Sequence, residues 1–139
     1  MNRPGVDELV AAARAAREHA YAPYSGYRVG AALLTEDGEV VTGANVENAS
    51  YGSSMCAERV AVVAAVAAGH RRFAAIAVAV AGADPARLCG ACRQVLHEFP
   101  AGPDIEVICA GEDGEQLLVV KLGELLPHAF APRQLGIKP

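Results

Sequence analysis

The stretches Cys56-Ala57-Glu58-Arg59 and Cys89-Gly90-Ala91-Cys92 decide how the rest of this 139-residue chain is interpreted. Each stretch stands where a helix is predicted to begin. Ser53 and Ser54, residue types that favour helix caps, precede the first, and an apolar run over 60–68 follows it. The second continues into 93–99, where apolar residues recur at helical spacing. Because a helix start favours the thiolate form, two such starts brought together would offer three thiolates to one metal ion.

The number of candidate ligands indicates which kind of metal site this is. Three protein ligands with one open position are typical of catalytic zinc, whereas structural zinc sites normally have four ligands. Glu58 lies two residues after Cys56, close enough to approach the open position without being a ligand. The pattern therefore predicts one Zn²⁺ per chain and hydrolysis by a zinc-bound water.

Two alternatives to a catalytic zinc site stay open at this point. The cysteines could be structural or redox thiols, or Cys109 could complete a closed site of four cysteines. Cys109 lies within the apolar run 107–110, where a free cysteine usually behaves as a small buried hydrophobic residue. A structural zinc module without catalysis would be indifferent to the loss of Glu58.

Length and composition limit the classes of protein that the chain can belong to. With 53% hydrophobic and 20% charged residues, we expect a single folded domain over residues 1–139. The formal net charge of −4 and the absence of a Lys/Arg run disfavour a nucleic-acid polymer as partner. The apolar stretches are interrupted before roughly 18 residues, so no membrane span is expected. With no export signal visible, metal binding is favoured over disulfides, and a cytoplasmic location is expected.

The order of predicted elements indicates an α/β fold. Helices are expected at 7–20, from Cys56 to 68 with Gly69 ending it, at 89–99 and at 122–126. Strands are expected at 28–35 and 39–46 as a hairpin, and at 73–81, 105–110 and 116–121. A three-layer α/β/α sandwich with a mixed five-stranded sheet accounts for this order, and its β-α-β links would give parallel neighbours. A proline-punctuated tail over 127–139 completes the chain.

A polar loop over 45–52 precedes the first cysteine helix. One interpretation is that these polar residues only form turns. Alternatively, Asn45 and Glu47 can hold two hydroxyl groups of a sugar, since an amide and a carboxylate have complementary donor and acceptor capacities.

Taken together, these residues resemble the small, homotetrameric, zinc-dependent cytidine deaminases. The resemblance covers most of the chain, in order and at fitting spacing, and its segments are 23–25, 29–34, 45–52, 56–59, 89–95 and 125–130. It implies a cytidine deaminase-like fold. It also implies hydrolytic deamination of cytidine and deoxycytidine to uridine and deoxyuridine plus ammonia, in pyrimidine salvage, by a zinc-bound hydroxide with a glutamate proton shuttle; the general zinc-deaminase chemistry is well described.

The resemblance also implies roles for individual residues. Cys56, Cys89 and Cys92 would be the zinc ligands, Glu58 the proton shuttle, and Arg59 the cation that offsets the negative charge of three thiolates. The residues expected to bind the nucleoside are Asn45 and Glu47 at the ribose, Tyr27 near the pyrimidine, and Ala57, Ala49, Tyr51 and Phe130. Of these, Ala49, Tyr51 and Phe130 would reach a neighbouring subunit's site in a homotetramer with shared sites.

One departure from the family pattern concerns the residue before the second cysteine pair. Leu88 stands where the family usually has a proline whose carbonyl faces the leaving amine. This leaves a related aminonucleoside deaminase, such as a blasticidin S deaminase, as the alternative activity. Asn45-Val46-Glu47-Asn48 and the tail with Phe130 favour the cytidine enzyme.

Overall fold

The computed structural model describes residues 3–138; Pro139, the last residue of the predicted tail, lies outside the described residues. The strands are β1 (Gly30–Thr35), β2 (Val40–Ala44), β3 (Phe73–Ala79), β4 (Glu106–Ala110) and β5 (Leu117–Lys121). The α-helices are α1 (Val6–Ala16), α2 (Ala57–Ala67), α3 (Gly90–His97) and α4 (Leu122–Leu125). Short 3₁₀ helices are η1 (Arg17–His19), η2 (Tyr51–Ser53), η3 (Gly102–Asp104) and η4 (Pro132–Leu135).

The five strands form one mixed sheet in the order β2-β1-β3-β4-β5, which confirms the predicted fold class. Only the β3–β4 pair is parallel; β1 runs antiparallel to both β2 and β3, and β5 runs antiparallel to β4. The expectation that both β-α-β links give parallel neighbours is therefore wrong for one of them. The link through α2 joins β2 to β3, and β1 lies between these two strands because it pairs with both.

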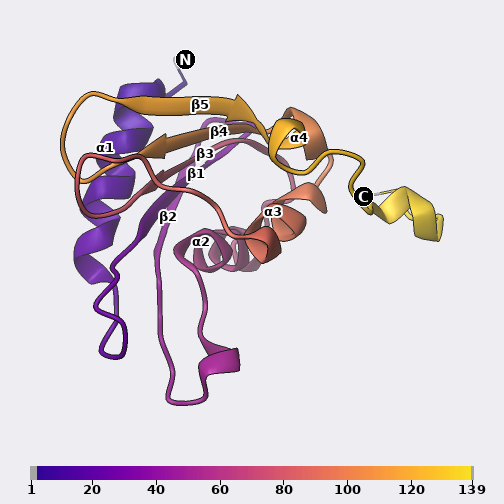
Figure 1. Cartoon of the computed structure of the whole chain (residues 1–139). Helices are drawn as coiled ribbons and strands as arrows, with labels where there is room; N and C mark the ends of the chain where they lie inside the picture. Colours follow the sequence, from indigo (N-terminus) through magenta and orange to yellow (C-terminus); the bar gives the residue numbers. More distant parts are fainter. Residues whose placement is uncertain (1–2, 139) are drawn as a thin grey trace.

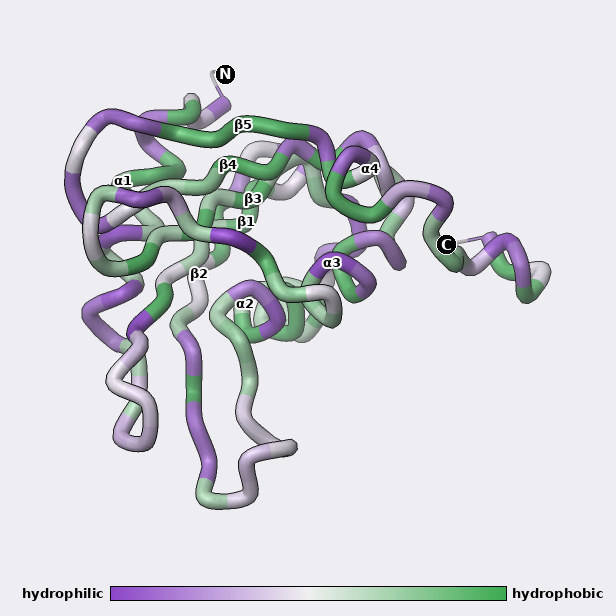
Figure 2. Tube along the Cα trace, viewed as in Figure 1, coloured by the Kyte–Doolittle hydropathy of each residue, from purple (hydrophilic) through white to green (hydrophobic). Residues whose placement is uncertain are grey.

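Helices cover both faces of the sheet, as Figure 1 shows, with α1 on one side and α2 and α3 on the other. The alternation of side chains along β1 separates the two cores: Ala32 and Leu34 face α1, whereas Ala31 and Leu33 face α2. The three central strands β1, β3 and β4 are almost entirely buried and are mostly green, hydrophobic, in the trace of Figure 2, whereas the edge strands β2 and β5 are partly exposed.

Close contact between α2 and the edge of the sheet sets the position of the first cysteine helix. A Cβ atom at Gly43 in β2 would lie 2.7 Å from the Ala57 carbonyl oxygen and 2.5 Å from the Ala61 nitrogen. Only glycine allows this approach, so the first turn of α2 rests directly on β2. The other end of α2 is closed by Gly69, as predicted, which has a φ of 101°.

Two local predictions about helix ends are wrong. Ser53 and Ser54 do not cap α2; its N-cap is Cys56, and the Ser54 hydroxyl instead accepts the Asn48 N–H at 3.0 Å. The predicted helix over 7–20 is shorter, because α1 ends at Ala16 and tightens into η1. There the Arg17 side chain donates to the carbonyl oxygen of Arg28 at 2.9 Å, so a tertiary contact decides this helix end.

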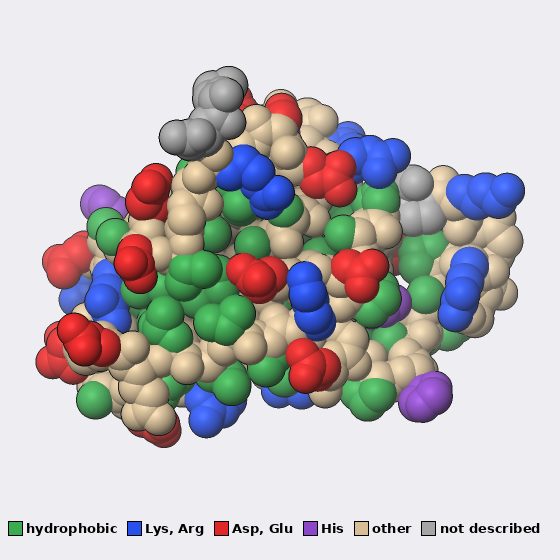
Figure 3. Space-filling model, turned by 90° about the horizontal axis from the view of Figure 1, so that it is seen from above, with side chains coloured by type: hydrophobic (Ala, Val, Ile, Leu, Met, Phe, Trp, Pro, Cys, Tyr) green, Lys and Arg blue, Asp and Glu red, His purple; other side chains and the backbone are tan. Residues whose placement is uncertain are grey.

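The distribution of charge on the surface agrees with the sequence, which has no run of Lys and Arg residues. On the face drawn in Figure 3, acidic and basic side chains alternate around an apolar area. This face therefore provides no continuous basic track for a phosphate backbone. Among the described residues, none of the helices is long and apolar enough to cross a membrane.

Candidate active site

The three predicted ligand cysteines meet where α2 and α3 begin. Cys56 is the N-cap of α2, Cys89 is the N-cap of α3, and Cys92 lies in the first turn of α3. Their sulfur atoms all lie within 4.8 Å of one another. The Sγ atoms of Cys56 and Cys89 are 3.7 Å apart and those of Cys89 and Cys92 are 3.1 Å apart. A tetrahedral zinc ion with Zn–S bonds of about 2.3 Å separates its sulfur ligands by about 3.8 Å. The Cys56–Cys89 distance matches this value, and the Cys89–Cys92 distance is shorter, so a bound ion would have to widen that pair. Three thiols at two helix starts are a donor set that suits zinc.

The fourth cysteine does not take part in this group. Cys109 lies in β4 with 1% of its surface exposed and belongs to the core on the α2 side of the sheet. Within residues 3–138, the cluster of potential metal ligands that contains cysteine includes Cys56, Cys89 and Cys92 alone. The prediction that Cys109 is a buried hydrophobic residue is confirmed, and the site keeps a three-thiol character.

The electrostatic environment favours a negative charge on the Cys56 thiol. Hydrogen bonding with Cys92, followed by Arg59, lowers the pKa of Cys56 to about 5. The same hydrogen bond with Cys56, together with burial, raises the pKa of Cys92, because the two sulfur atoms share one proton. A bound cation would take the place of that proton, which is the usual way in which metal binding by thiols releases protons.

Arg59 and Glu58 lie beside the thiols in the first turn of α2. The Arg59 Nη2 atom is 3.7 Å from the Cys56 sulfur and donates to the Ser54 carbonyl oxygen at 3.3 Å. Glu58 is only 4% exposed. Burial, and secondly the charge of Cys56, raise the pKa of the Glu58 carboxyl group, so this group can hold a proton more readily than an exposed glutamate.

A cavity of about 250 Å³ opens at these residues. Cys56, Glu58 and Cys89 line it from the two helix starts, and Asn45, Glu47 and Tyr27 line it from the loops around β1 and β2. This volume lies just below the range of about 300–1,000 Å³ that is usual for small-molecule sites, so the cavity suits one small ligand. The structure therefore brings six of the predicted site residues together in one place.

The two predicted sugar-binding residues are held in defined orientations. The Asn45 amide donates to the Tyr27 carbonyl oxygen at 2.8 Å and accepts the Val29 N–H at 2.9 Å. Glu47 accepts the Tyr24 and Ser25 N–H groups at 2.9 and 3.0 Å and also the Ser25 hydroxyl. The Ser25 hydrogen bond is the main reason that the pKa of Glu47 is lowered, so Glu47 stays an anion.

The other predicted ligand-binding residues do not line this cavity. Ala57 is fully buried behind it, and Ala49, Tyr51 and Phe130 are exposed. Tyr51 is 75% exposed and contacts Tyr24 edge-on, with ring centroids 5.8 Å apart. Phe130 is 59% exposed and lies on the segment after α4, which Figure 1 shows at the far end of the molecule.

The sequence analysis missed other residues that line the cavity. Ser25, Ser54, Met55, Val80 and Arg87 all contribute to its wall, as does Val29. Ser25 lies in the family segment 23–25, so its place next to Glu47 had a signal in the sequence. Arg87, two residues before Cys89, had none, because the cation reaches the cavity only through the fold of the loop 82–88.

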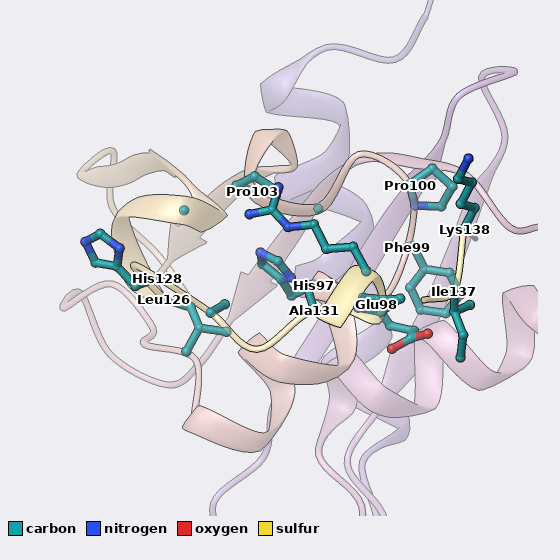
Figure 4. A pocket seen from close by; sticks show the side chains of 15 residues that line it. His97, Glu98, Phe99, Pro100, Pro103, Leu126, His128, Ala131, Ile137 and Lys138 are labelled. Carbon is teal, nitrogen blue, oxygen red and sulfur yellow. The ribbon is translucent and has the colours of Figure 1, made fainter. Parts of the chain in front are cut away.

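A larger hollow of about 620 Å³ lies elsewhere, between the end of α3, α4 and the C-terminal segment (Figure 4). Its lining includes His97, His128 and Ile137 but none of the three ligand cysteines. The chemistry therefore belongs to the smaller cavity. A three-thiol group with a buried carboxyl group beside it defines the class of site: a catalytic zinc centre of a hydrolytic enzyme.

Comparison with known proteins agrees with this class. Residues 6–109 match the family model described as the cytidine and deoxycytidylate deaminase zinc-binding region. The chain is 47% identical over 129 residues to a cytidine deaminase of Halalkalibacterium halodurans, covering 92% of this chain and 96% of the relative. It is 45% identical over 132 residues to a cytidine deaminase of Sporosarcina psychrophila, covering 94% and 95%.

Solved structures show the same relationship. The crystal structure of a cytidine deaminase from Burkholderia pseudomallei superimposes with a TM-score of 0.86 at 52% identity, covering 91% of this chain and all of that chain. A cytidine deaminase from Mycobacterium tuberculosis superimposes with a TM-score of 0.75 at 41% identity, covering 89% and 95%. The chain belongs to the zinc-binding cytidine and deoxycytidylate deaminase family.

Proposed function

We propose that this protein hydrolytically deaminates cytidine and deoxycytidine, giving uridine and deoxyuridine plus ammonia, and that it acts in pyrimidine salvage. Water adds at C4 of the base and the bond between C4 and the exocyclic amine breaks. The observation that carries the proposal is the cluster of three thiols, two of which line a cavity together with the buried Glu58. The relatives' names support the choice of substrate.

Cys56, Cys89 and Cys92 would hold one zinc ion, and Arg59 would offset part of the charge of the three thiolates. When bound, zinc lowers the pKa of a coordinated water from 15.7 to about 7. The protein's own part is to present three thiolates at two helix starts, where backbone N–H groups and the helix dipole stabilise negative charge.

Glu58 is proposed as the proton carrier. Its raised pKa suits a group that must accept a proton and release it again near neutral pH. It would take a proton from the attacking water and deliver it to N3 of the ring. It would then take the second proton from the hydroxyl group now on C4 and deliver it to N4 as the bond between C4 and N4 breaks. Its burial keeps bulk water from competing for these protons.

The opposite side of the cavity is proposed to hold the sugar. Asn45 and Glu47 are both fixed by hydrogen bonds to backbone groups, so they would meet a ribose or deoxyribose hydroxyl without reorganising. Tyr27 would contact the base or sugar at the rim of the cavity. The Ala57 side chain does not line the cavity, but its backbone lies between Cys56 and Glu58 at the start of α2, from where it would contact the base.

We further propose a homotetramer whose sites are shared between subunits. Ala49, Tyr51 and Phe130 are exposed in the single chain and lie outside its own cavity, as residues that serve a neighbouring site would. A cytoplasmic location is also proposed, because a site that needs three reduced thiols requires a reducing compartment.

Ultraviolet assays on the purified, zinc-loaded protein test the activity. Cytidine, deoxycytidine and blasticidin S are offered separately, and the absorbance change that accompanies loss of the amine is followed. We expect turnover of both pyrimidine nucleosides and little or none of blasticidin S. Turnover of blasticidin S alone would replace the proposal with the related aminonucleoside activity, for which Leu88 is the sequence indication.

A further inference from the structure

The C-terminal segment over 127–138, called the tail below, is held to the rest of the protein by very few polar contacts. Among the described residues, one hydrogen bond joins it to the rest of the chain: Gln94 Nε2 donates to the Phe130 carbonyl oxygen at 2.8 Å. Its other hydrogen bonds are internal, such as those that the Ala131 N–H donates to Gln134 and that Gly136 donates to Arg133. The tail borders the hollow of about 620 Å³ drawn in Figure 4 and buries Pro132, and Gln94 provides its polar anchor to the rest of the described chain.

Arg93, the residue before Gln94, makes a second connection from the same turn of α3. Its Nε donates to the Leu88 carbonyl oxygen at 2.9 Å, and its Nη1 donates to the Leu125 carbonyl oxygen at 2.7 Å. Leu88 immediately precedes the ligand Cys89, and Leu125 is the last residue of α4, just before the tail begins. One guanidinium group thus ties the loop that carries a ligand to the base of the tail.

The two anchoring residues directly follow the proposed metal ligands in the same helix. Cys89 and Cys92 occupy the start of α3, and Arg93 and Gln94 follow without a break in the helix. Any shift of the first turn of α3 on metal loss moves both anchoring side chains. We propose that Arg93 and Gln94 are positioning residues that make the placement of the tail depend on the metal-binding turn of α3.

Metal binding and anchoring of the tail should stabilise each other. A metal that orders the first turn of α3 stabilises the anchored tail, and by thermodynamic reciprocity an anchored tail raises the affinity of the site for the metal. The exposed Phe130 side chain is then presented in a fixed place only while the turn is intact, because its own carbonyl group is the atom that Gln94 holds.

Hydrogen exchange on the full-length protein, without substrate, tests this coupling. We expect amides of 127–137 to exchange faster after zinc is removed by a chelator, while amides of β3 stay protected as an internal reference. Gln94→Glu keeps the size of the side chain but removes the donor, so its tail should exchange fast with or without zinc. Gln134→Ala is the matched control, since it removes a contact within the tail, and it should keep the dependence on zinc.

The reciprocal measurement uses folded, zinc-loaded variants. The affinity for zinc, measured by equilibrium competition with a chromogenic chelator, should fall about two- to tenfold in Gln94→Glu, which loses one exposed hydrogen bond between neutral groups. It should fall about tenfold or more in Arg93→Gln, which loses the hydrogen bonds of a charged donor. Arg93→Lys should recover part of the loss, since an ammonium can reach only one of the two carbonyl groups. Tail exchange that does not depend on zinc in the wild-type protein, or equal zinc affinity in all variants, would overturn the proposal. Neither readout depends on deaminase activity, so failure here leaves the proposed function standing.

Discussion

The two helix starts of this site are built alike and used differently. Each has a cysteine as its N-cap and an arginine one turn later: Cys56 with Arg59 on α2, and Cys89 with Arg93 on α3. Arg59 turns to the sulfur of its own N-cap cysteine at 3.7 Å. Arg93 turns away from the sulfur atoms, to the carbonyl oxygens of Leu88 and Leu125.

The difference follows from what surrounds each helix. The start of α2 lies against β2 at Gly43, with Glu58 buried beside the thiols, so its charged side chains act on the reacting centre. The start of α3 lies next to the loop 82–88 and the end of α4, whose carbonyl groups are acceptors for a guanidinium group. Under the proposed function, α2 supplies one metal ligand, the proton carrier and the charge-balancing arginine, whereas α3 supplies two metal ligands and the residues that anchor the tail.

The largest expected effect is loss of a ligand at the α3 start. Cys89→Ala should lose zinc and deamination together, because two thiols hold zinc much less tightly than three. Metal content by atomic absorption and the ultraviolet assay measure both. Cys109→Ala is the control and should keep both, since Cys109 lies in the core of the sheet; zinc loss in this control would point to a closed four-cysteine site.

Glu58→Gln tests the catalytic assignment of α2. The variant should keep its fold and its zinc but lose roughly 10²–10⁴-fold in kcat, because the amide cannot carry the proton. Glu8→Gln is the matched control: Glu8 is also a first-turn helix glutamate, and its loss should leave kcat unchanged. A Glu58→Gln enzyme that retains more than about a tenth of the wild-type rate contradicts the shuttle role.

The two arginines separate the two helix starts most directly. Arg59→Gln should speed zinc release about tenfold, because the Cys56 thiolate loses its charged neighbour and its pKa rises. Tail exchange should not change in this variant, whereas Arg93→Gln should increase it. If both variants loosen the tail equally, the distinction between the two helix starts is wrong.

Phe130→Ala tests whether the anchored tail serves a neighbouring site. Aromatic contacts contribute about 0.5–1.5 kcal/mol beyond burial, so kcat/KM should fall about two- to tenfold with zinc retained. Activity should also fall on dilution when the tetramer dissociates. Light scattering that shows a fully active monomer at nanomolar concentration would exclude shared sites.

The smallest effect is expected at Ser25, away from both helix starts. Ser25→Ala should raise KM for cytidine about threefold with kcat unchanged, because Glu47 loses the hydroxyl group that orients it. The effect is small because water can replace the hydroxyl at this exposed position. The hydrogen bond keeps the folded pKa of Glu47 below its ordinary value, so its loss raises that pKa. Glu47 then becomes protonated at a higher pH as the pH falls, and KM should rise earlier on the acid side than in wild type. Ser53→Ala, with no side-chain hydrogen bond in the described structure, is the control, and an equal KM change there would remove the special role of Ser25.

The catalytic centre was predictable because its signals are local. A cysteine before an apolar helix and a C-x-x-C pair before another place three thiols at helix starts, whatever the rest of the fold does. The fold class was predictable from the order of elements for the same reason. The helix caps were not: the prediction chose Ser53 and Ser54 by residue type, but pairing of Val46 with Met55 brings Cys56 to the N-cap.

The sequence alone predicted the three candidate ligands and Glu58, since each lies in a short motif at the start of a helix, and the order of the elements predicted a mixed sheet. Tertiary structure decided that β1 separates β2 from β3, that Ser25 and Arg87 join the cavity, and that Arg59 and Arg93 have different partners. The reason for the different partners is the length of the arginine side chain. A long arginine side chain can bond to any acceptor that the fold brings near, and the Leu125 carbonyl is 32 residues from Arg93 along the chain.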